Sequence, residues 1–344
     1  MRKLVLRVCF IGLFSTTSYA LPPTLVAVNK QTIDLSSYFS PGSTLQEVNL
    51  FSNIISGFVS GPQTGLFILK DSVASVHSNP GGAIQFVGFG QDRVYGSNRY
   101  FDTITRNETL LSFANAPINF TSFSISSASG NKVYGQYNQS GPMMMPKYFF
   151  GTVNNDNSIS WQDAPTSDAD GTFYFKGISG NTAFGSYMAN SNNPNYTPKG
   201  LLYDITSGNK TFLEVPESYG SLVDFVTGGN VYGTYNFVVS QNPNMTGPGS
   251  YLLETRGYVY DGQKISTLAF EDPSVSGGYD FSSFSRPSGS SSTTSSFSAD
   301  GNTVAVSGNT SSTSFITAQL PEPSALSLCA VGLSGWAMMR RRRS

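Results

Sequence analysis

The chain of 344 residues contains few of the side chains that most enzymes use for covalent or metal chemistry. It has one histidine, His77, and two cysteines, Cys9 and Cys329. Both cysteines lie in apolar segments near the ends of the chain. The long stretch between them therefore has no thiol, and it can form neither a disulfide nor a cysteine-based metal site.

Charge and helix-forming residues are also scarce. Only 12% of the residues are charged, and the segment 21–320 holds thirteen basic and twenty acidic residues, a net charge of −7. An acidic body without a basic run argues against nucleic acid and anionic lipid as partners. Long Ala/Leu/Glu/Lys patterns are absent, while Gly, Ser, Asn, Thr, Tyr and Phe are abundant. This composition predicts an all-β fold.

The N-terminal segment has the three parts of a secretory signal. Met1-Arg2-Lys3 is followed by an apolar run from Leu4 to Leu13, and then by Ser18-Tyr19-Ala20. Basic, apolar and small-x-small segments in this order are typical of a signal peptide. We therefore expect a signal helix in residues 1–20, cleavage after Ala20, and export of the segment 21–320.

The C-terminal segment, residues 321–344, has a second three-part pattern. Pro321, Glu322 and Pro323 precede an uncharged apolar run over 325–339. An arginine cluster follows, consisting of Arg340, Arg341, Arg342 and Arg343. As a helix the apolar run would span about 22 Å of a hydrocarbon layer about 30 Å thick. Arginines resist translocation, so we expect a transmembrane helix with its basic end in the cytoplasm.

This tail resembles the PEP-CTERM sorting signal, which is also called an ice-binding protein C-terminal motif, a name that implies nothing about ice. The resemblance covers residues 320–344. It implies a protein exported in a Gram-negative bacterium and handled by an exosortase-like membrane protease. It also implies transient anchoring in the inner membrane and delivery to the cell envelope, outer surface or extracellular matrix, where exopolysaccharide is made. It implies no catalytic residues, because the tail alone defines the family.

A short motif that contains a glycine recurs through the segment 21–320, as in Asn131-Lys132-Val133-Tyr134-Gly135-Gln136-Tyr137. Its glycines are Gly57, Gly96, Gly135, Gly185 and Gly233, and Val306 takes the equivalent place in a sixth copy. The spacings are 39, 39, 50, 48 and 73 residues. A period of 40–50 residues is typical of one four-stranded propeller blade. We expect about six imperfect four-stranded units in a β-propeller-like ring, with residues 24–35 as the closing strand. A pair of β-sandwiches and a β-solenoid are the alternative architectures.

Two further structural expectations follow from the repeats. Tyr134, Phe184 and Tyr232 occupy equivalent strand positions, and repeated aromatics at such positions usually pack in a core. The segment 282–298 is rich in serine and threonine, a composition that cannot bury a core, so we expect a solvated loop there. This loop explains the long spacing before the sixth copy.

The remaining chemistry-bearing residues give little support for catalysis. We expect His77 to lie in a polar surface loop, because turn residues surround it. Asp168-Ala169-Asp170-Gly171 resembles part of a calcium loop, but Thr166 and Gly177 fall where that loop needs carboxylates. We predict a polar turn there instead. The sequence therefore predicts no catalytic residue, no metal, no cofactor and no enzymatic activity.

The most promising binding residues lie in two Asn-Pro-Asn segments. Asn193, Asn195 and Tyr196 lie in one, and Asn242 and Asn244 lie in the other. Both segments are expected between the second and third strands of their units, and hence on one face of the ring. Amides beside a flat ring suit sugar hydroxyls and C–H faces, although Asn-Pro also favours plain turns.

The sequence thus predicts an exported, non-enzymatic structural or interaction protein of the cell envelope or matrix, associated with exopolysaccharide. A carbohydrate-binding propeller is one alternative. An envelope hydrolase that acts on polysaccharide is the other, although convergent carboxylates cannot be recognised from one sequence.

Overall fold

A computed structural model shows an all-β protein, which confirms the predicted fold class. It describes residues 22–51, 54–70, 73–77, 86–90, 92–141, 146–190, 197–241, 251–274, 278–281, 284, 297–300, 303–307 and 314–321. Within these ranges there are 26 strands, and the one helical element is a 3-10 turn over Ser36–Tyr38.

Most strands belong to six successive antiparallel groups of four, here called units 1 to 6. Unit 1 contains β2 (Thr44–Phe51), β3 (Ile54–Ser60), β4 (Gly65–Lys70) and β5 (Val73–His77). Unit 2 contains β6 (Phe86–Gly90), β7 (Arg93–Gly96), β8 (Arg99–Asp102) and β9 (Glu108–Leu110). Unit 3 contains β11 (Phe120–Ser129), β12 (Lys132–Gln139), β13 (Lys147–Val153) and β14 (Ser158–Asp163).

The other three units follow the same order. Unit 4 contains β15 (Gly171–Ser179), β16 (Thr182–Ala189), β17 (Lys199–Asp204) and β18 (Lys210–Leu213). Unit 5 contains β19 (Ser218–Thr227), β20 (Asn230–Gln241), β21 (Tyr251–Tyr260) and β22 (Ile265–Glu271). Unit 6 contains β24 (Phe297–Asp300), β25 (Thr303–Ser307), β26 (Ser314–Gln319) and β1 (Thr24–Asp34). Two short strands are additions: β10 (Ser112–Phe113) pairs with β14, and β23 (Tyr279–Asp280) pairs with β22.

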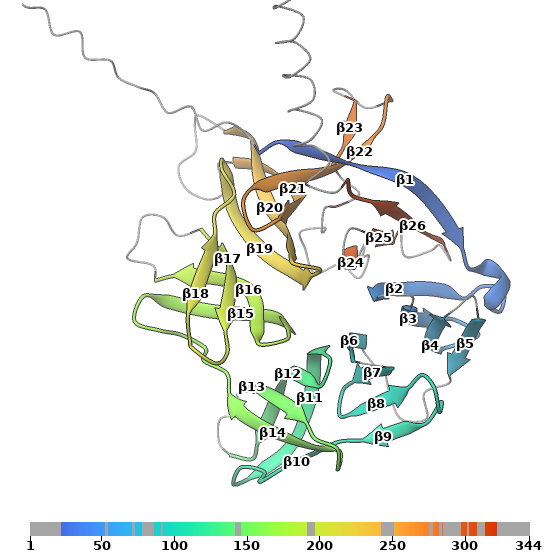
Figure 1. The fold of residues 1–344 in the computed structure, drawn as a ribbon, viewed down its shortest axis with the longest axis vertical. Helices are drawn as coiled ribbons and strands as arrows, with labels where there is room; N and C mark the ends of the chain where they lie inside the picture. Colours follow the sequence, from blue (N-terminus) through green and yellow to red (C-terminus); the bar gives the residue numbers. More distant parts are fainter. Residues whose placement is uncertain are drawn as a thin grey trace, which may run out of the picture.

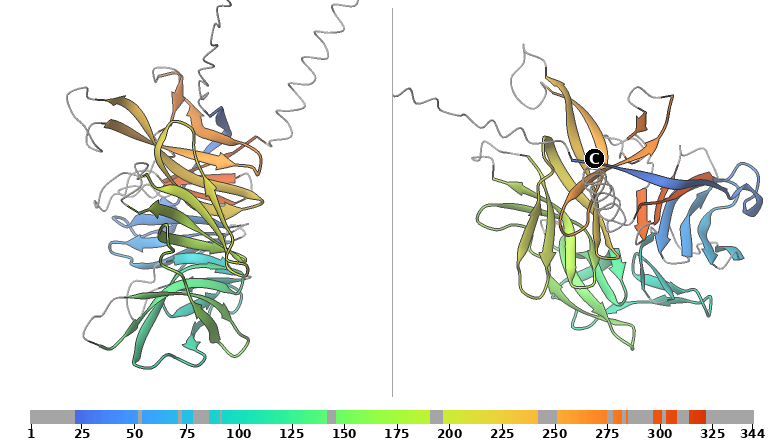
Figure 2. Two further views of the ribbon diagram at one scale, coloured as in Figure 1. Left: turned by 90° about the vertical axis from the view of Figure 1, so that its left-hand side faces the viewer. Right: turned by 45° about the horizontal axis from the view of Figure 1, so that its top comes forward.

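The units are arranged around a common centre (Figure 1). The first strand of each unit contacts the first strands of its two neighbours, in the circuit β2, β6, β11, β15, β19, β24 and back to β2. The contacts form a complete circuit, so the described units make a closed ring with their first strands innermost. The long hairpin of β20 and β21 projects from it (Figure 2).

The N-terminal strand β1 closes this ring. Its first residues, Thr24 to Ala27, pair in parallel with β22 of unit 5. From Val28 onwards the strand pairs antiparallel with β26, with an irregularity that includes Asn29 at φ +55°, and it becomes the fourth strand of unit 6. The position predicted for the closing strand is therefore confirmed.

The recurring glycines lie in the second strands of units 1 to 5, and in three of them the structure shows why glycine is needed. Gly135, Gly185 and Gly233 each pair with the residue just before a β-bulge in the first strand. A Cβ on Gly135 would overlap the carbonyl oxygen of Ser124 and lie 2.8 Å from Cε1 of Phe149. The glycine therefore permits a close backbone approach that any side chain would block.

The core lies between neighbouring units as well as within them. Tyr134, Phe184 and Tyr232 are all buried, as predicted. Phe184 packs with residues of unit 5, including Val223 and Tyr258. Each unit thus buries an apolar face against the next, which a single four-stranded sheet could not do alone.

The prediction for the segment 282–298 is wrong at Phe284, the first residue described after Phe281. Phe284 is fully buried and stacks on Phe270 with the ring centroids 4.7 Å apart. A single aromatic residue in a serine-rich segment can anchor it, because one ring buries enough apolar area. β24 also begins inside the segment, at Phe297.

The signal residues 1–20, including Ala20, and the tail residues 322–344 lie outside the described part of the chain. Pro321 is described, directly after β26 and Leu320, and is partly buried. Among the described residues we find no helix with the length and apolar character needed to cross a membrane.

Candidate functional site

The ring has two faces that differ in their connections. One carries the turns between first and second strands, such as Gly130-Asn131 and Gly180-Asn181, and we call it the turn face. The other carries the connections between second and third strands, and we call it the loop face. The predicted binding residues Asn193, Asn195, Tyr196, Asn242 and Asn244 all lie outside the described residues.

The strands that flank these two segments are described. β16 and β20 are the second strands of units 4 and 5, and β17 and β21 are the third. The ends of these strands that border the two segments in the sequence therefore lie at equivalent places, on the loop face.

A polar cluster lies at the end of β16. Asn190 donates hydrogen bonds to the carbonyl oxygens of Ala169 and Asp170, at 3.0 and 2.8 Å. Oδ1 of Asp168 accepts hydrogen bonds from the backbone N–H groups of Asp170 and Gly171, at 2.9 and 2.8 Å. Residues 168–171 therefore form a polar turn, which confirms the prediction for Asp168-Ala169-Asp170-Gly171.

The Asp168 carboxylate is also held by two side chains. It accepts a hydrogen bond from the Tyr187 hydroxyl at 3.2 Å and forms an ion pair with Lys210. Burial alone would raise the pKa of Asp168, but the Lys210 ammonium and the two backbone donors together hold this pKa below its usual value. Burial, and then the Asp168 charge, raise the pKa of Tyr187. The ring of Phe212, which is 39% exposed, lies beside Tyr187 with centroids 4.9 Å apart.

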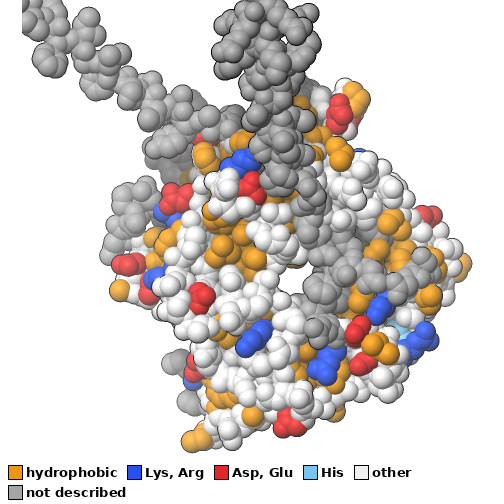
Figure 3. All heavy atoms as spheres, in the orientation of Figure 1, with side chains coloured by type: hydrophobic (Ala, Val, Ile, Leu, Met, Phe, Trp, Pro, Cys, Tyr) orange, Lys and Arg blue, Asp and Glu red, His pale blue; other side chains and the backbone are white. Residues whose placement is uncertain are grey.

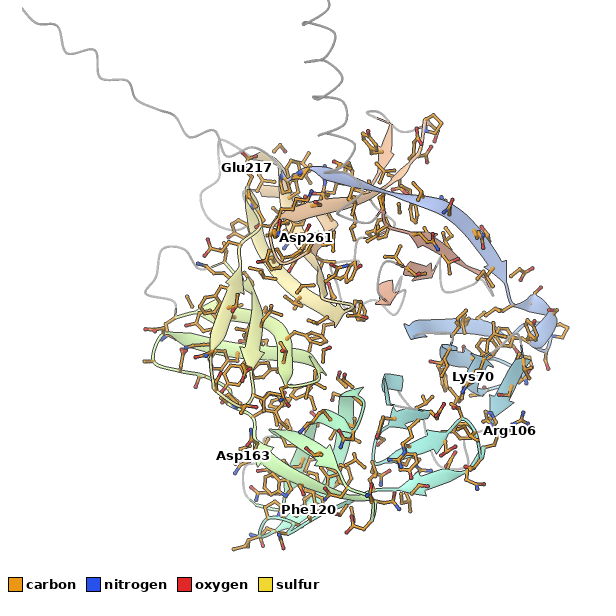
Figure 4. The ribbon with its side chains drawn as sticks, viewed as in Figure 1. Lys70, Arg106, Phe120, Asp163, Glu217 and Asp261 are labelled. Carbon is orange, nitrogen blue, oxygen red and sulfur yellow. The ribbon has the colours of Figure 1, made fainter. Side chains whose placement is uncertain are left out.

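Unit 3 has an equivalent cluster. The Tyr137 hydroxyl donates to Oδ1 of Asp163 at 2.7 Å. Burial, and then this hydrogen bond, raise the pKa of Tyr137 to about 12. Trp161 lies beside Tyr137, and its indole N–H donates to the Ala114 carbonyl oxygen. Asp163 is exposed on the rim of the ring, where unit 3 joins unit 4 (Figure 4).

The two clusters share one construction. Tyr137 and Tyr187 each lie two residues after the motif glycine, near the end of a second strand. Each donates to an aspartate and lies beside an aromatic ring that is at least partly exposed. Carboxylates that accept from hydroxyls, next to flat apolar rings, suit the polar edges and apolar faces of sugars.

The prediction that His77 lies in a surface loop is wrong. His77 is the last residue of β5, and its ring packs against Phe101 of unit 2 with centroids 4.3 Å apart. Burial, and then the nearby Arg106, lower the pKa of His77, while Glu108 opposes them. The neutral imidazole thus serves as packing between units 1 and 2.

No family model matches the chain, and no curated protein matches it. Among solved structures the chain is similar to the levansucrase from Gluconacetobacter diazotrophicus, at 11% sequence identity and a TM-score of 0.31. The match covers 88% of this chain and 84% of that one. A likeness of this size assigns no activity to the present chain.

The match is nevertheless to an enzyme, and it contradicts the prediction that the chain is not one. That prediction depended on the lack of thiols and on the single histidine. Hydrolysis of glycosidic bonds needs neither of these, because two carboxylates are sufficient. We therefore withdraw the prediction.

Sequence reasoning missed most of the residues in the two polar clusters. The sequence predicts Asp168 only as part of a polar turn, and it does not indicate Asp163, Tyr137 or Trp161 as site residues. One signal was available, because a tyrosine follows the motif glycine by two residues in units 3, 4 and 5. The aspartates carry no such signal, since Asp163 ends β14 whereas Asp168 lies in the connection before β15.

Proposed function

We propose that the chain is an exported component of the cell envelope or extracellular matrix, associated with exopolysaccharide and sorted by its PEP-CTERM-like tail. The folded body is a six-bladed β-propeller closed by β1. The closed circuit of first strands favours this architecture over a sandwich pair or a solenoid, since each of those leaves its sheets without such a circuit.

The main support for the proposal is that the start of β1 and the end of β26 lie on the same face of the ring. Val28 of β1 pairs with Gln319 of β26, so the start of β1 and the end of β26 lie together. Thr303 at the start of β25 also pairs with Gln319, which places this end of unit 6 on the turn face. The signal peptide and the sorting tail would therefore both extend from the turn face. A body anchored in this way presents its loop face away from the membrane.

The loop face supports association with a neutral polymer. It is the face of the two Asn-Pro-Asn segments and of the Tyr137–Asp163 and Tyr187–Asp168 clusters. Figure 3 draws the opposite, turn face, where the described acidic and basic side chains are interspersed instead of forming a patch of one sign. That face therefore offers no one-signed patch of described side chains to attract a charged partner over long range.

Cell fractionation tests the sorting step. The full chain should be recovered from the envelope, and a chain without residues 321–344 should be released as an exported soluble protein. An unchanged cytoplasmic pool in both cases would refute export.

A matched variant separates a sorting signal from an ordinary membrane anchor. Replacing Pro321 and Pro323 with alanine keeps the apolar segment and the arginine cluster. If the tail is a sorting signal, this variant should stay in the inner membrane, whereas the parent chain should reach the outer surface or the extracellular matrix. An ordinary anchor predicts the same location for both.

A further inference from the structure

Units 3 and 4 carry the same tyrosine–aspartate pair at equivalent places near the loop face. In unit 3 the Tyr137 hydroxyl donates to Asp163 at 2.7 Å. In unit 4 the Tyr187 hydroxyl donates to Asp168 at 3.2 Å. The equivalent tyrosine of unit 5, Tyr235, instead shares a buried hydrogen bond with a threonine. Of these three units, only units 3 and 4 therefore combine the tyrosine with a carboxylate, and they are neighbours in the ring.

Both carboxylates are accessible at the surface of the protein. Asp163 is exposed, and Oδ2 of its carboxylate has no hydrogen-bond partner among the described residues. The Asp168 side chain is 22% exposed, and that of its ion-pair partner Lys210 is 33% exposed. An ammonium group can donate three hydrogen bonds, so Lys210 can donate to a ligand as well as to Asp168. A ligand that lies on this surface can therefore form hydrogen bonds at both pairs without entering an internal cavity.

An aromatic ring lies beside each pair. Phe212 is 39% exposed on β18, the outermost strand of unit 4, and its ring centroid is 4.9 Å from that of Tyr187. In unit 3 the half-buried Trp161 lies 5.3 Å from Tyr137 and stacks on Phe113 of the edge strand β10. Sugars have C–H faces that pack on flat rings and hydroxyls that reach the polar groups beside them.

The charges of the two pairs select an uncharged ligand. Among the described residues Asp163 forms no ion pair, so unit 3 presents a negative charge that repels an anion. In unit 4 the Lys210 ammonium offsets the charge of Asp168 and repels a cation. A neutral ligand with many hydroxyl groups is compatible with both pairs.

The two pairs are close enough for one ligand chain to contact both. Asp163 and Asp168 are five residues apart in the sequence. Their Cα atoms are therefore at most about 18 Å apart. When one chain binds at two linked sites, the second contact is intramolecular, and the overall affinity exceeds that of either site. Two equivalent sites at this spacing thus favour a repeating polymer over a single free sugar.

We propose that units 3 and 4 form a two-part binding surface for a neutral polysaccharide. One part contains Tyr137, Asp163 and Trp161, and the other contains Tyr187, Asp168, Lys210 and Phe212. Each part binds one sugar residue of the same polymer chain. The polymer as the ligand rests on the proposed association with exopolysaccharide, and the two-part surface adds the contacting residues and the absence of charge on the polymer.

Calorimetric titration of the full chain, purified in a detergent without a sugar headgroup, tests this surface. The neutral probes are dextran and galactomannan, each compared with its monosaccharide, D-glucose or D-mannose, and polygalacturonate is the acidic probe. At least one neutral polymer should bind about tenfold or more tightly than its monosaccharide. Asp163→Asn and Phe212→Ala should each weaken polymer binding about tenfold, because each removes one of the two contacts.

Two matched variants serve as controls. Asp156→Asn makes the same change in unit 3, in the turn between β13 and β14 on the turn face. Tyr174→Ala removes another exposed ring of unit 4, one that is 51% exposed on β15. Both variants should bind the polymer like the parent chain.

The outcomes separate this inference from the proposed function. If neither neutral polymer binds, the two-part surface is refuted, while the sorting function is still decided by fractionation. If a polymer binds but Asp163→Asn and Phe212→Ala bind it like the parent chain, association with polymer stands and this surface is refuted. Equal affinity for polymer and monosaccharide would refute the two-part construction, and tighter binding of polygalacturonate would refute the neutral ligand.

Discussion

Replacing Gly135 with alanine tests the structural reason for the repeated motif. The new Cβ would meet the backbone carbonyl oxygen of Ser124 and the buried ring of Phe149. Overpacking in a core usually costs 1–3 kcal/mol, and here neither neighbour is a flexible side-chain end. We therefore expect a loss of about 3 kcal/mol in the free energy of unfolding. For a domain of about 300 residues, an unfolding entropy of about 2.1 cal/mol/K per residue converts this loss into a fall of about 5 °C in melting temperature.

Gly141 supplies the control for this experiment. It also belongs to unit 3, but a Cβ added there would meet no heavy atom within 4 Å. Gly141→Ala should change the free energy of unfolding by less than about 0.5 kcal/mol. Thermal unfolding followed by circular dichroism compares the two variants. Equal melting temperatures would refute the proposed role of the motif glycine.

Three further predictions concern single side chains. Phe284→Ala should lower the free energy of unfolding by about 3–5 kcal/mol in a denaturant titration, because it removes a buried aromatic ring from the core. A loss below about 1 kcal/mol would show that the Phe284 side chain is exposed to solvent. The folded pKa of Asp168 is lowered, so its contribution to stability is present above the unfolded value and is lost as pH falls through the folded pKa. Asp168→Asn, which removes the charge paired with Lys210, should therefore make the melting temperature less sensitive to pH below about 4, and an unchanged acid dependence would contradict this. The pKa of Tyr137 is raised to about 12, so its contribution is full below about pH 10 and is lost as pH rises towards 12. Tyr137→Phe should remove the ionisation of one tyrosine near pH 12 from the ultraviolet titration. If the absorbance change near pH 12 is the same in the variant and the parent chain, the hydrogen bond from Tyr137 to Asp163 is contradicted.

The repeat could be predicted because it is a local pattern with a local cause. Gly135, Gly185 and Gly233 are each needed where a second strand passes a bulge, so the glycine recurs in units 3, 4 and 5. The buried aromatic residue directly before each of these glycines follows from the same strand geometry. The closing strand was predictable because the ring needs a fourth strand in its last unit.

Features that depend on contacts between distant segments could not be predicted. His77 and Phe101 belong to different units, and nothing near His77 in the sequence indicates the aromatic partner. Lys176 and Asp224 lie 48 residues apart, and their ion pair follows only from the bulges of β15 and β19, which meet between units 4 and 5. Phe284 was missed for a related reason, since its burial depends on Phe270 and not on the serine-rich residues around it.

The most direct test of the central claim is the N-terminal sequence of the protein recovered from each cell fraction. The account predicts that the protein is found in the envelope or outside the cell and begins at Leu21. A soluble cytoplasmic protein that still begins at Met1 would contradict it.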